Sequence, residues 1–159
     1  MQMRRIAEQE NTMTTPEPVV ERIFHKLGGR SALGTDVYSD ADLARVVHRR
    51  LQLKVLPHLV RVGFSKQEIH SFVIPARTLT HRKARKEPLT IEESDRVVRL
   101  ARIQALAEDV FGDAAKANRW LRDKLAMLEG KSPLELAQTE SGARLVEQLL
   151  AKIDWGAAA

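Results

Sequence analysis

The sequence has no cysteine, and aromatic residues make up only 4% of its 159 residues. The absence of cysteine excludes disulfides, catalytic thiolates and cysteine-ligated zinc, and it is typical of proteins in a reducing cytoplasm. The scarcity of aromatic residues, beside a hydrophobic content of 43% rich in alanine and leucine, favours an all-α fold over a β-sheet protein.

Long hydrophobic runs are also missing. No apolar stretch approaches the roughly 18 residues of a membrane span, and the N-terminus lacks the basic-then-apolar order of a signal peptide. We therefore expect a cytoplasmic protein with no membrane partner. Its length allows one domain of ordinary size or two very small ones.

Positive charge is concentrated in one short segment, residues 61–86. This segment holds seven Lys or Arg and a single acid, Glu68, which gives a net charge of +6, whereas the whole chain carries +5. The remaining residues therefore sum to about −1. Such a local excess of positive charge is typical of a surface that contacts nucleic acid.

The same segment predicts a helix-turn-helix. Ser65 and Glu68 form a capping box that starts one helix, and Pro75 ends that helix because it disfavours helical backbone at the residue before it. Proline also suits the start of a new helix, which we expect over residues 76–83.

In this motif the first residues of the second helix face base edges in the major groove, and basic residues after them reach phosphates. We predict that bases are read by Arg77, Thr78, His81 and Arg82, and that phosphates are bound by Lys83, Arg85 and Lys86. The alternative interpretation is that residues 81–86 form a solvated basic linker, but the turn and the second helix favour DNA binding.

Apolar residues at helical spacing predict further helices on both sides of this segment. Before it, we expect a helix over residues 19–27 that stops at Gly28-Gly29, a helix after Ser39, and a brief helix with Pro57 in its first turn. After it, we expect helices from Thr90 to Phe111, from Asp113 to Gly130, from Ser132, and from Thr139 to about Ile153.

Motifs for catalysis or cofactor binding are weak or absent. Gly130-Lys131-Ser132 resembles the end of a phosphate-binding loop, but the required earlier glycine falls at position 125, which is leucine, so a helix cap is the better interpretation. No two of the five histidines have the i,i+3 or i,i+4 spacing of a metal-binding pair. We therefore expect no enzymatic activity, no cofactor and no metal.

Several stretches of the sequence resemble a known family. They are GFSKQEI, RTLTHRK, LTIEESDRVVRLARIQALAEDVFGD, RWL and GKSPLELAQTESGARLVEQLLAKIDWG, within a run from Gly63 to the C-terminus that is about 60% of the chain. This run resembles the Xre/MbcA/ParS-type antitoxins that neutralise RES-domain toxins. The resemblance implies an all-α protein that binds operator DNA and represses its own operon. We expect a flexible arm at 1–17, an Xre-like helix-turn-helix region at 18–89, and a small helical toxin-binding domain at 90–159.

The resemblance also implies how the partner toxin is inhibited. RES toxins consume NAD, and the C-terminal end of the antitoxin is thought to occlude their NAD-binding cleft. In this chain that end comprises Ile153, Asp154, Trp155, Gly156, Ala157, Ala158 and Ala159, and we expect the residues after Ile153 to form a tail beyond the last helix. Small residues would enter a narrow cleft, Asp154 would meet a cationic group, and Trp155 would anchor the interface. The alternative for Trp155 is that its ring folds back onto the C-terminal helix.

Two positions in the turn depart from the family pattern. Val73 stands where relatives commonly have glycine, and Pro75 where they have a capping serine. A β-branched residue resists positive φ, and proline offers no side-chain acceptor, so both positions bear on the geometry of the turn.

The apolar stripe from Val97 to Val110, with the last helix, offers more apolar surface than a C-terminal domain of 70 residues readily buries. Two operator half-sites also need two helix-turn-helix units. We therefore expect a homodimer. The alternative function is a stand-alone transcription regulator whose C-terminal domain serves dimerisation or binds a small ligand.

Overall fold

The computed structural model describes residues 17–157, and these form ten α-helices and two short 3₁₀ helices, with no β-strand among them. In chain order the elements are α1 (Val19–Lys26), α2 (Gly29–Leu33), α3 (Asp40–His48), η1 (Leu53–Val55), α4 (Leu56–Arg61), α5 (Lys66–Phe72), α6 (Ala76–Arg85), α7 (Ile91–Phe111), α8 (Ala114–Trp120), η2 (Ala126–Leu128), α9 (Pro133–Leu136) and α10 (Glu140–Ala157). The predicted all-α class is confirmed. Within this part of the chain we find no helix with the length and hydropathy that a membrane span requires.

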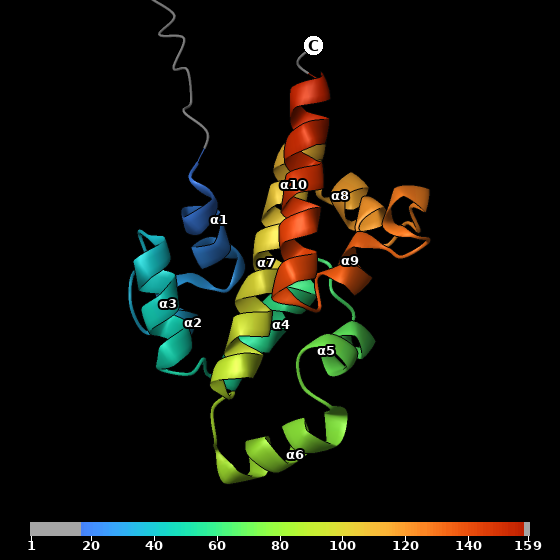
Figure 1. Cartoon of the computed structure of the whole chain (residues 1–159). Helices are drawn as coiled ribbons and strands as arrows, with labels where there is room; N and C mark the ends of the chain where they lie inside the picture. Colours follow the sequence, from blue (N-terminus) through green and yellow to red (C-terminus); the bar gives the residue numbers. More distant parts are fainter. Residues whose placement is uncertain (1–16, 158–159) are drawn as a thin grey trace, which may run out of the picture.

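The central element is α7, which lies between two groups of helices (Figure 1). It packs against α1 and α3 on one side and against α8 and α10 on the other. Its inward side chains, among them Val97, Leu100 and Ile103, are buried. Full burial of an aliphatic side chain of this size contributes roughly 1.5–3 kcal/mol to the stability of the fold. The helix α7 is therefore the central element against which the other helices pack.

This packing corrects one part of the argument that predicted a dimer, the apolar stripe of α7, whereas the last helix, the other part, leaves Leu145 53% exposed. The fully buried residues of the stripe are covered by helices of the same chain, and Leu106 and Val110 are partly buried against the same core. The stripe therefore leaves no large apolar face for a second copy to cover. The argument from two operator half-sites is unaffected.

Four helices begin with a capping box at the positions that the sequence indicates. In each, the N-cap hydroxyl accepts a hydrogen bond from the backbone N–H three residues on, and the acid there accepts one from the N-cap N–H. The pairs are Ser39 with Asp42, Ser65 with Glu68, Thr90 with Glu93, and Ser132 with Glu135. Because replacing an N-cap by alanine typically costs about 0.5–2 kcal/mol, these helix starts are fixed locally.

The predicted helix from Asp113 to Gly130 is wrong beyond Trp120, where α8 ends. The carbonyl of Leu121 accepts a hydrogen bond from the N–H of Leu134 at 2.9 Å, and Leu125 is extended and pairs with Lys131. A contact between distant segments therefore overrides the helical spacing. The short helix α2, which follows Gly28, was not predicted.

The prediction that residues 154–157 lie beyond the last helix is also wrong, because α10 continues to Ala157. The apolar stripe weakens after Leu150, but no proline follows it, so no residue from 151 to 157 forbids helical backbone. Ala158 and Ala159 lie outside the described residues, as do residues 1–16 of the predicted arm.

Candidate functional site

The helix-turn-helix consists of α5 and α6, joined by Val73, Ile74 and Pro75. Val73 has a φ of −115°, so the turn needs no positive φ at the position where relatives commonly have glycine. Val73 and Ile74 are 1% and 0% exposed, and their N–H groups both donate to the carbonyl of Ile69, at 2.9 and 3.1 Å. Arg96 of α7 donates to the carbonyl of Val73 at 3.3 Å.

Pro75 is the N-cap of α6 and contributes no side-chain hydrogen bond. The turn is therefore fixed by buried side chains and by α7, and both departures from the family pattern are accommodated.

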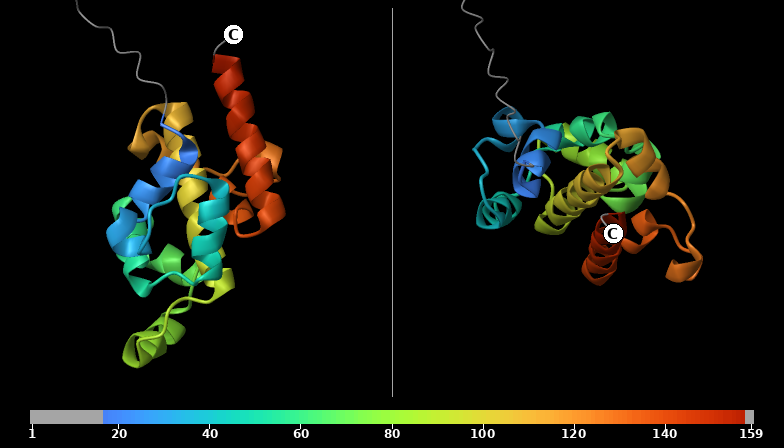
Figure 2. Two further views of the ribbon diagram at one scale, coloured as in Figure 1. Left: turned by 90° about the vertical axis from the view of Figure 1, so that its left-hand side faces the viewer. Right: turned by 90° about the horizontal axis from the view of Figure 1, so that it is seen from above.

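The second helix, α6, lies at one end of the molecule and projects from its body, as Figures 1 and 2 show. Five of the residues predicted to bind DNA are exposed, namely Arg77, His81, Lys83, Arg85 and Lys86, whereas Thr78 is half-buried. Among residues 17–157, none of the cations in these exposed five forms an ion pair. On α6 and its C-cap the structure thus presents exposed cations that no acid pairs within the described part of the chain.

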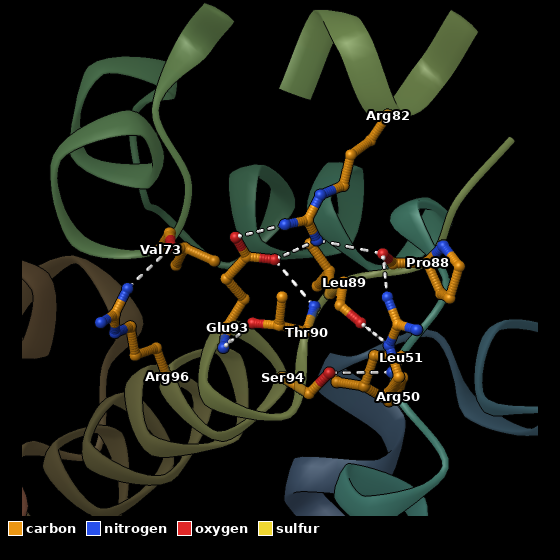
Figure 3. A network of polar contacts seen from close by, with 10 residues as sticks. All are labelled: Arg50, Leu51, Val73, Arg82, Pro88, Leu89, Thr90, Glu93, Ser94 and Arg96. Carbon is orange, nitrogen blue, oxygen red and sulfur yellow. Dashed lines mark hydrogen bonds and ion pairs between the residues drawn. The ribbon is translucent and has the colours of Figure 1, made fainter. Parts of the chain in front are cut away.

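Arg82, predicted to read bases, is engaged inside the protein. Its guanidinium pairs with both carboxylate oxygens of Glu93 in α7, and its Nη1 also donates to the carbonyl of Pro88 at 3.1 Å (Figure 3). The side chains of Arg82 and Glu93 are only 14% and 10% exposed. In this arrangement Arg82 does not face the surface that Arg77 and His81 present.

A second ion pair joins the helix-turn-helix to the segment after α8. Arg122 donates to both carboxylate oxygens of Glu68 at 2.8 Å, to the carbonyl of Gly63 at 2.8 Å and to that of Asn118 at 2.6 Å. Burial would raise the pKa of Glu68, but the hydrogen bonds from Arg122 and from the Ser65 N–H outweigh it and lower this pKa.

The turn before α5 is close to Asn118 as well. Asn118 donates to the carbonyl of Val62 at 3.1 Å, and a Cβ on Gly63, which has a φ of +116°, would lie 2.2 Å from the Asn118 amide nitrogen. Neither this contact nor the Arg122 pair was predicted from the sequence, which holds no local signal for either.

The far end of the molecule is formed by α10, whose C-terminal turns extend beyond the neighbouring helices (Figures 1 and 2). Its inward side chains Ala143, Val146 and Leu150 are buried, whereas Trp155 is 80% exposed. Asp154 and Gly156 are exposed too, and Ile153 is half-buried. The alternative that Trp155 folds back onto the helix is therefore not what the structure has.

The start of α10 approaches α9 closely. A Cβ on Gly142 would lie 1.8 Å from the carbonyl oxygen of Leu136, and the Gly142 N–H donates to the Thr139 hydroxyl at 3.0 Å. Glycine is thus required where these two helices meet.

One group of side chains has metal-ligand spacing among residues 17–157. It comprises Glu17, Glu21 and His25, whose ligand atoms lie within 4.8 Å of one another, and all three are exposed. The Nε2 of His25 lies 3.4 Å from Oε1 of Glu17. An ordinary surface ion pair explains this contact.

The fold and these surfaces define an all-α protein in which a helix-turn-helix precedes a helical C-terminal part with an exposed terminal helix. The family described as "Antitoxin Xre-like helix-turn-helix domain" matches residues 42–102. The family described as "Antitoxin Xre/MbcA/ParS C-terminal toxin-binding domain" matches residues 106–156. The chain belongs to the Xre/MbcA/ParS antitoxin family.

Curated relatives agree with this assignment. The chain is 45% identical over 84 residues to "Antitoxin Xre" of Pseudomonas putida, a match that covers 53% of each chain. It is 38% identical over 84 residues to "Antitoxin Xre" of Yersinia enterocolitica, covering 52% of this chain and 57% of that one. It is 32% identical over 89 residues to "Prs ADP-ribosylating antitoxin" of a Sphingobium species, covering 50% and 56%. The chain spans about half the length of the curated relatives it matches.

Proposed function

We propose that this protein is an antitoxin that binds and inhibits a RES-domain, NAD-consuming toxin and represses its own operon by binding DNA. The observation that carries the proposal is the match of residues 106–156 to a toxin-binding domain, in a segment that ends in the exposed part of α10. This match favours an antitoxin over a stand-alone transcription regulator. The protein acts by binding, with no reaction or cofactor of its own.

Two points support an NAD-consuming toxin as the partner. The sequence resembles the antitoxins of RES toxins, and one relative has a name that pairs an antitoxin with ADP-ribosylation. ADP-ribosylation takes its ADP-ribose group from NAD. A protein that blocks such a toxin needs only to exclude NAD from the cleft.

We propose that the inhibitory element is the C-terminal end of α10, comprising Ile153 to Ala159. The last carbonyl groups of a helix carry partial negative charge, and Asp154 adds a full one, so this end suits a cleft whose cations hold the phosphates of NAD. Trp155, 80% exposed, offers a large ring for burial at an interface. A Cβ on Gly156 would meet nothing within 4 Å apart from its own helix backbone, so this side of the helix end is open to the cleft wall.

This proposal is tested by removing residues 156–159, or by combining Asp154→Arg with Trp155→Ala. Residues 154–156 are exposed, so folding and DNA binding should be unchanged. We expect the toxin to be retained less in pull-downs and cellular NAD to fall when both proteins are expressed. Gln148→Ala, an exposed change about two turns earlier in α10, is the matched control and should protect NAD fully.

If the truncated protein still protects NAD fully, inhibition arises elsewhere in the C-terminal part. Residues 133–139, which include α9, are then the next region to change.

We also propose that α6 binds operator DNA, with Arg77, Thr78 and His81 toward the bases and Lys83, Arg85 and Lys86 toward phosphates. The exposure of five of these residues supports this arrangement. A homodimer would present two copies of α6 to two half-sites, and we propose this assembly for the DNA-bound protein.

The division into residues 18–89 for DNA and 90–159 for toxin stays a prediction. The helix α7 packs on helices of both parts, and the two matched family segments meet within it.

A further inference from the structure

Packing holds α6 only weakly. Leu79 is the one side chain that this helix buries, and it keeps 9% exposure. On the side that faces α4 and α5, a groove of about 820 Å³ opens, with Ile69 and Leu79 in its lining and Lys83 at the α6 side. Because a helix with one buried side chain and an open groove beside it can tilt, apolar packing alone leaves its orientation weakly determined.

A charged link fixes the C-terminal half of α6. The guanidinium of Arg82 holds the Glu93 carboxylate in a two-pronged arrangement, with Nη2 3.1 Å from Oε1 and Nη1 in contact with Oε2 (Figure 3). The same Nη1 donates to the carbonyl of Pro88 at 3.1 Å. A pairing of this kind determines direction as well as distance, because the guanidinium is planar.

The partner of Arg82 is itself immobilised at the start of α7. The Glu93 carboxylate accepts a hydrogen bond from the Thr90 N–H at 2.8 Å, and the Thr90 hydroxyl accepts one from the Glu93 N–H at 3.1 Å. The capping box of α7 therefore serves as the fixed point to which α6 is tied.

Two residues that precede the helix-turn-helix, Arg50 and Leu51, also hold the connection between α6 and α7. Arg50 donates to the carbonyls of Leu89 at 2.8 Å and Pro88 at 3.3 Å, and the Leu51 N–H donates to the Ser94 hydroxyl at 2.9 Å (Figure 3). The connector cannot shift without breaking these bonds, so any tilt of α6 must break the pair of Arg82 with Glu93.

We propose that Arg82 is a positioning residue, whose ion pair with Glu93 sets the orientation at which α6 meets DNA and which does not itself read bases. This inference rests on the proposed DNA-binding function. Arg77 and His81 are four residues apart and share one face of α6, whereas Arg82 lies about 140° around the helix from Arg77. Base reading is left to Arg77, Thr78 and His81, and Arg85 remains toward phosphates.

Glu93→Gln gives the first test, because losing the charged partner of Arg82 should weaken DNA binding, whereas losing a negative charge alone should strengthen it. Glutamine still serves in a capping box, and removal of an acid near a DNA-binding surface strengthens binding when only charge matters. We expect instead that Glu93→Gln weakens binding to the upstream operator DNA roughly tenfold or more, because Arg82 loses its charged partner.

Glu92→Gln is the matched control, since Glu92 is the exposed neighbour at the same end of α7. It removes the same charge and should not weaken binding. If Glu93→Gln binds DNA as tightly as the wild type, or more tightly, the inference is overturned.

Changes at Arg82 separate positioning from direct contact. Arg82→Lys keeps the charge but not the planar fork, so it should lose as much affinity as Arg82→Gln. The salt slope of Arg82→Gln should equal that of the wild type, because no phosphate contact is removed. The double variant Arg82→Gln with Glu93→Gln should bind no more weakly than the weaker single variant. Full binding by Arg82→Lys, or a salt slope lowered by about one in Arg82→Gln, would show a phosphate contact and overturn the inference.

Hydrogen exchange tests the same link without DNA. In Glu93→Gln, the amides of α6 should exchange roughly tenfold faster than in the wild type, whereas those of α5 should be unchanged and Glu92→Gln should match the wild type. Unchanged protection of α6 would overturn the inference. A wild-type protein that binds no upstream DNA would refute the proposed DNA function, and the exchange result would still decide whether Arg82 holds α6.

Discussion

Arg122 allows a quantitative test of how the C-terminal part is joined to the helix-turn-helix. Arg122→Met removes the guanidinium and keeps most of the apolar stem. The guanidinium donates four hydrogen bonds, two to Glu68 and one each to the carbonyls of Gly63 and Asn118, at 2.6–2.8 Å. Without it, Glu68 keeps its place in the capping box of α5 but loses its cation.

The expected loss follows from the burial of the pair. Removing one partner of a fully buried ion pair costs about 3–5 kcal/mol, whereas an exposed pair contributes about 0–1 kcal/mol. The side chains of Arg122 and Glu68 are 32% and 20% exposed, which places the pair between these limits. We expect Arg122→Met to lower the free energy of unfolding by about 2 kcal/mol, and the melting temperature by about 4–8 °C.

Thermal unfolding followed by circular dichroism at pH 7 measures this effect. The matched control is Arg144→Met, whose partner Glu140 lies on the surface of α10, with exposures of 72% and 63%. The control should change the free energy of unfolding by less than about 0.5 kcal/mol. Equal melting temperatures for the two variants would refute the claim that Arg122 joins the two parts.

The pH dependence gives a second check on the same pair. The pKa of Glu68 is lowered below its ordinary value of 4.5. A carboxyl with a lowered folded pKa stabilises the protein above its unfolded pKa, and this contribution is lost as the pH falls through the folded value. The difference between the wild type and Arg122→Met should therefore be full at pH 7 and should shrink below about pH 4.5.

Three further predictions concern other parts of the molecule. Lys83→Ala or Lys86→Ala should weaken binding to all DNA sequences and lower the salt slope by about one for each lost phosphate contact; unchanged binding at every salt concentration would contradict the DNA proposal. Gly142→Ala should destabilise the protein by at least about 2 kcal/mol in chemical unfolding, because the new Cβ would lie 1.8 Å from the carbonyl oxygen of Leu136. At Gly156 a new Cβ would meet nothing within 4 Å, so Gly156→Ala should be neutral or stabilising by up to about 1 kcal/mol. Light scattering should give a homodimer, and a strictly monomeric mass at concentrations on the order of tens of micromolar would count against the proposed binding of two half-sites by two copies of α6.

Features set by neighbouring residues could be predicted from the sequence. The capping boxes of Ser65 with Glu68 and of Thr90 with Glu93 each join residues three apart, so their spacing alone locates the starts of α5 and α7. Pro75 likewise marks the turn between α5 and α6. These local signals, with the charge of residues 61–86, were enough to find the helix-turn-helix.

Features that depend on contacts between distant segments could not be predicted. In the sequence, Arg82 resembles the other basic residues of its helix. Only the folded structure places Glu93, eleven residues further along the chain, beside it. Arg122 and Glu68 are 54 residues apart, and α8 ends where it does because Leu121 accepts a hydrogen bond from Leu134. At the end of α10 the cause is different, because the apolar stripe weakens after Leu150 although no proline ends the helix there.

Competition between this protein and NAD for the toxin tests the central claim most directly. The affinity of the purified protein for a catalytically inactive form of the proposed RES-domain toxin is measured at increasing NAD concentrations. If the end of α10 occupies the NAD cleft, the apparent Kd of the wild-type protein should rise in proportion to NAD once NAD exceeds its own Kd, and that of the variant lacking residues 156–159 should rise less or not at all. An apparent Kd of the wild-type protein that stays constant at saturating NAD would contradict the account.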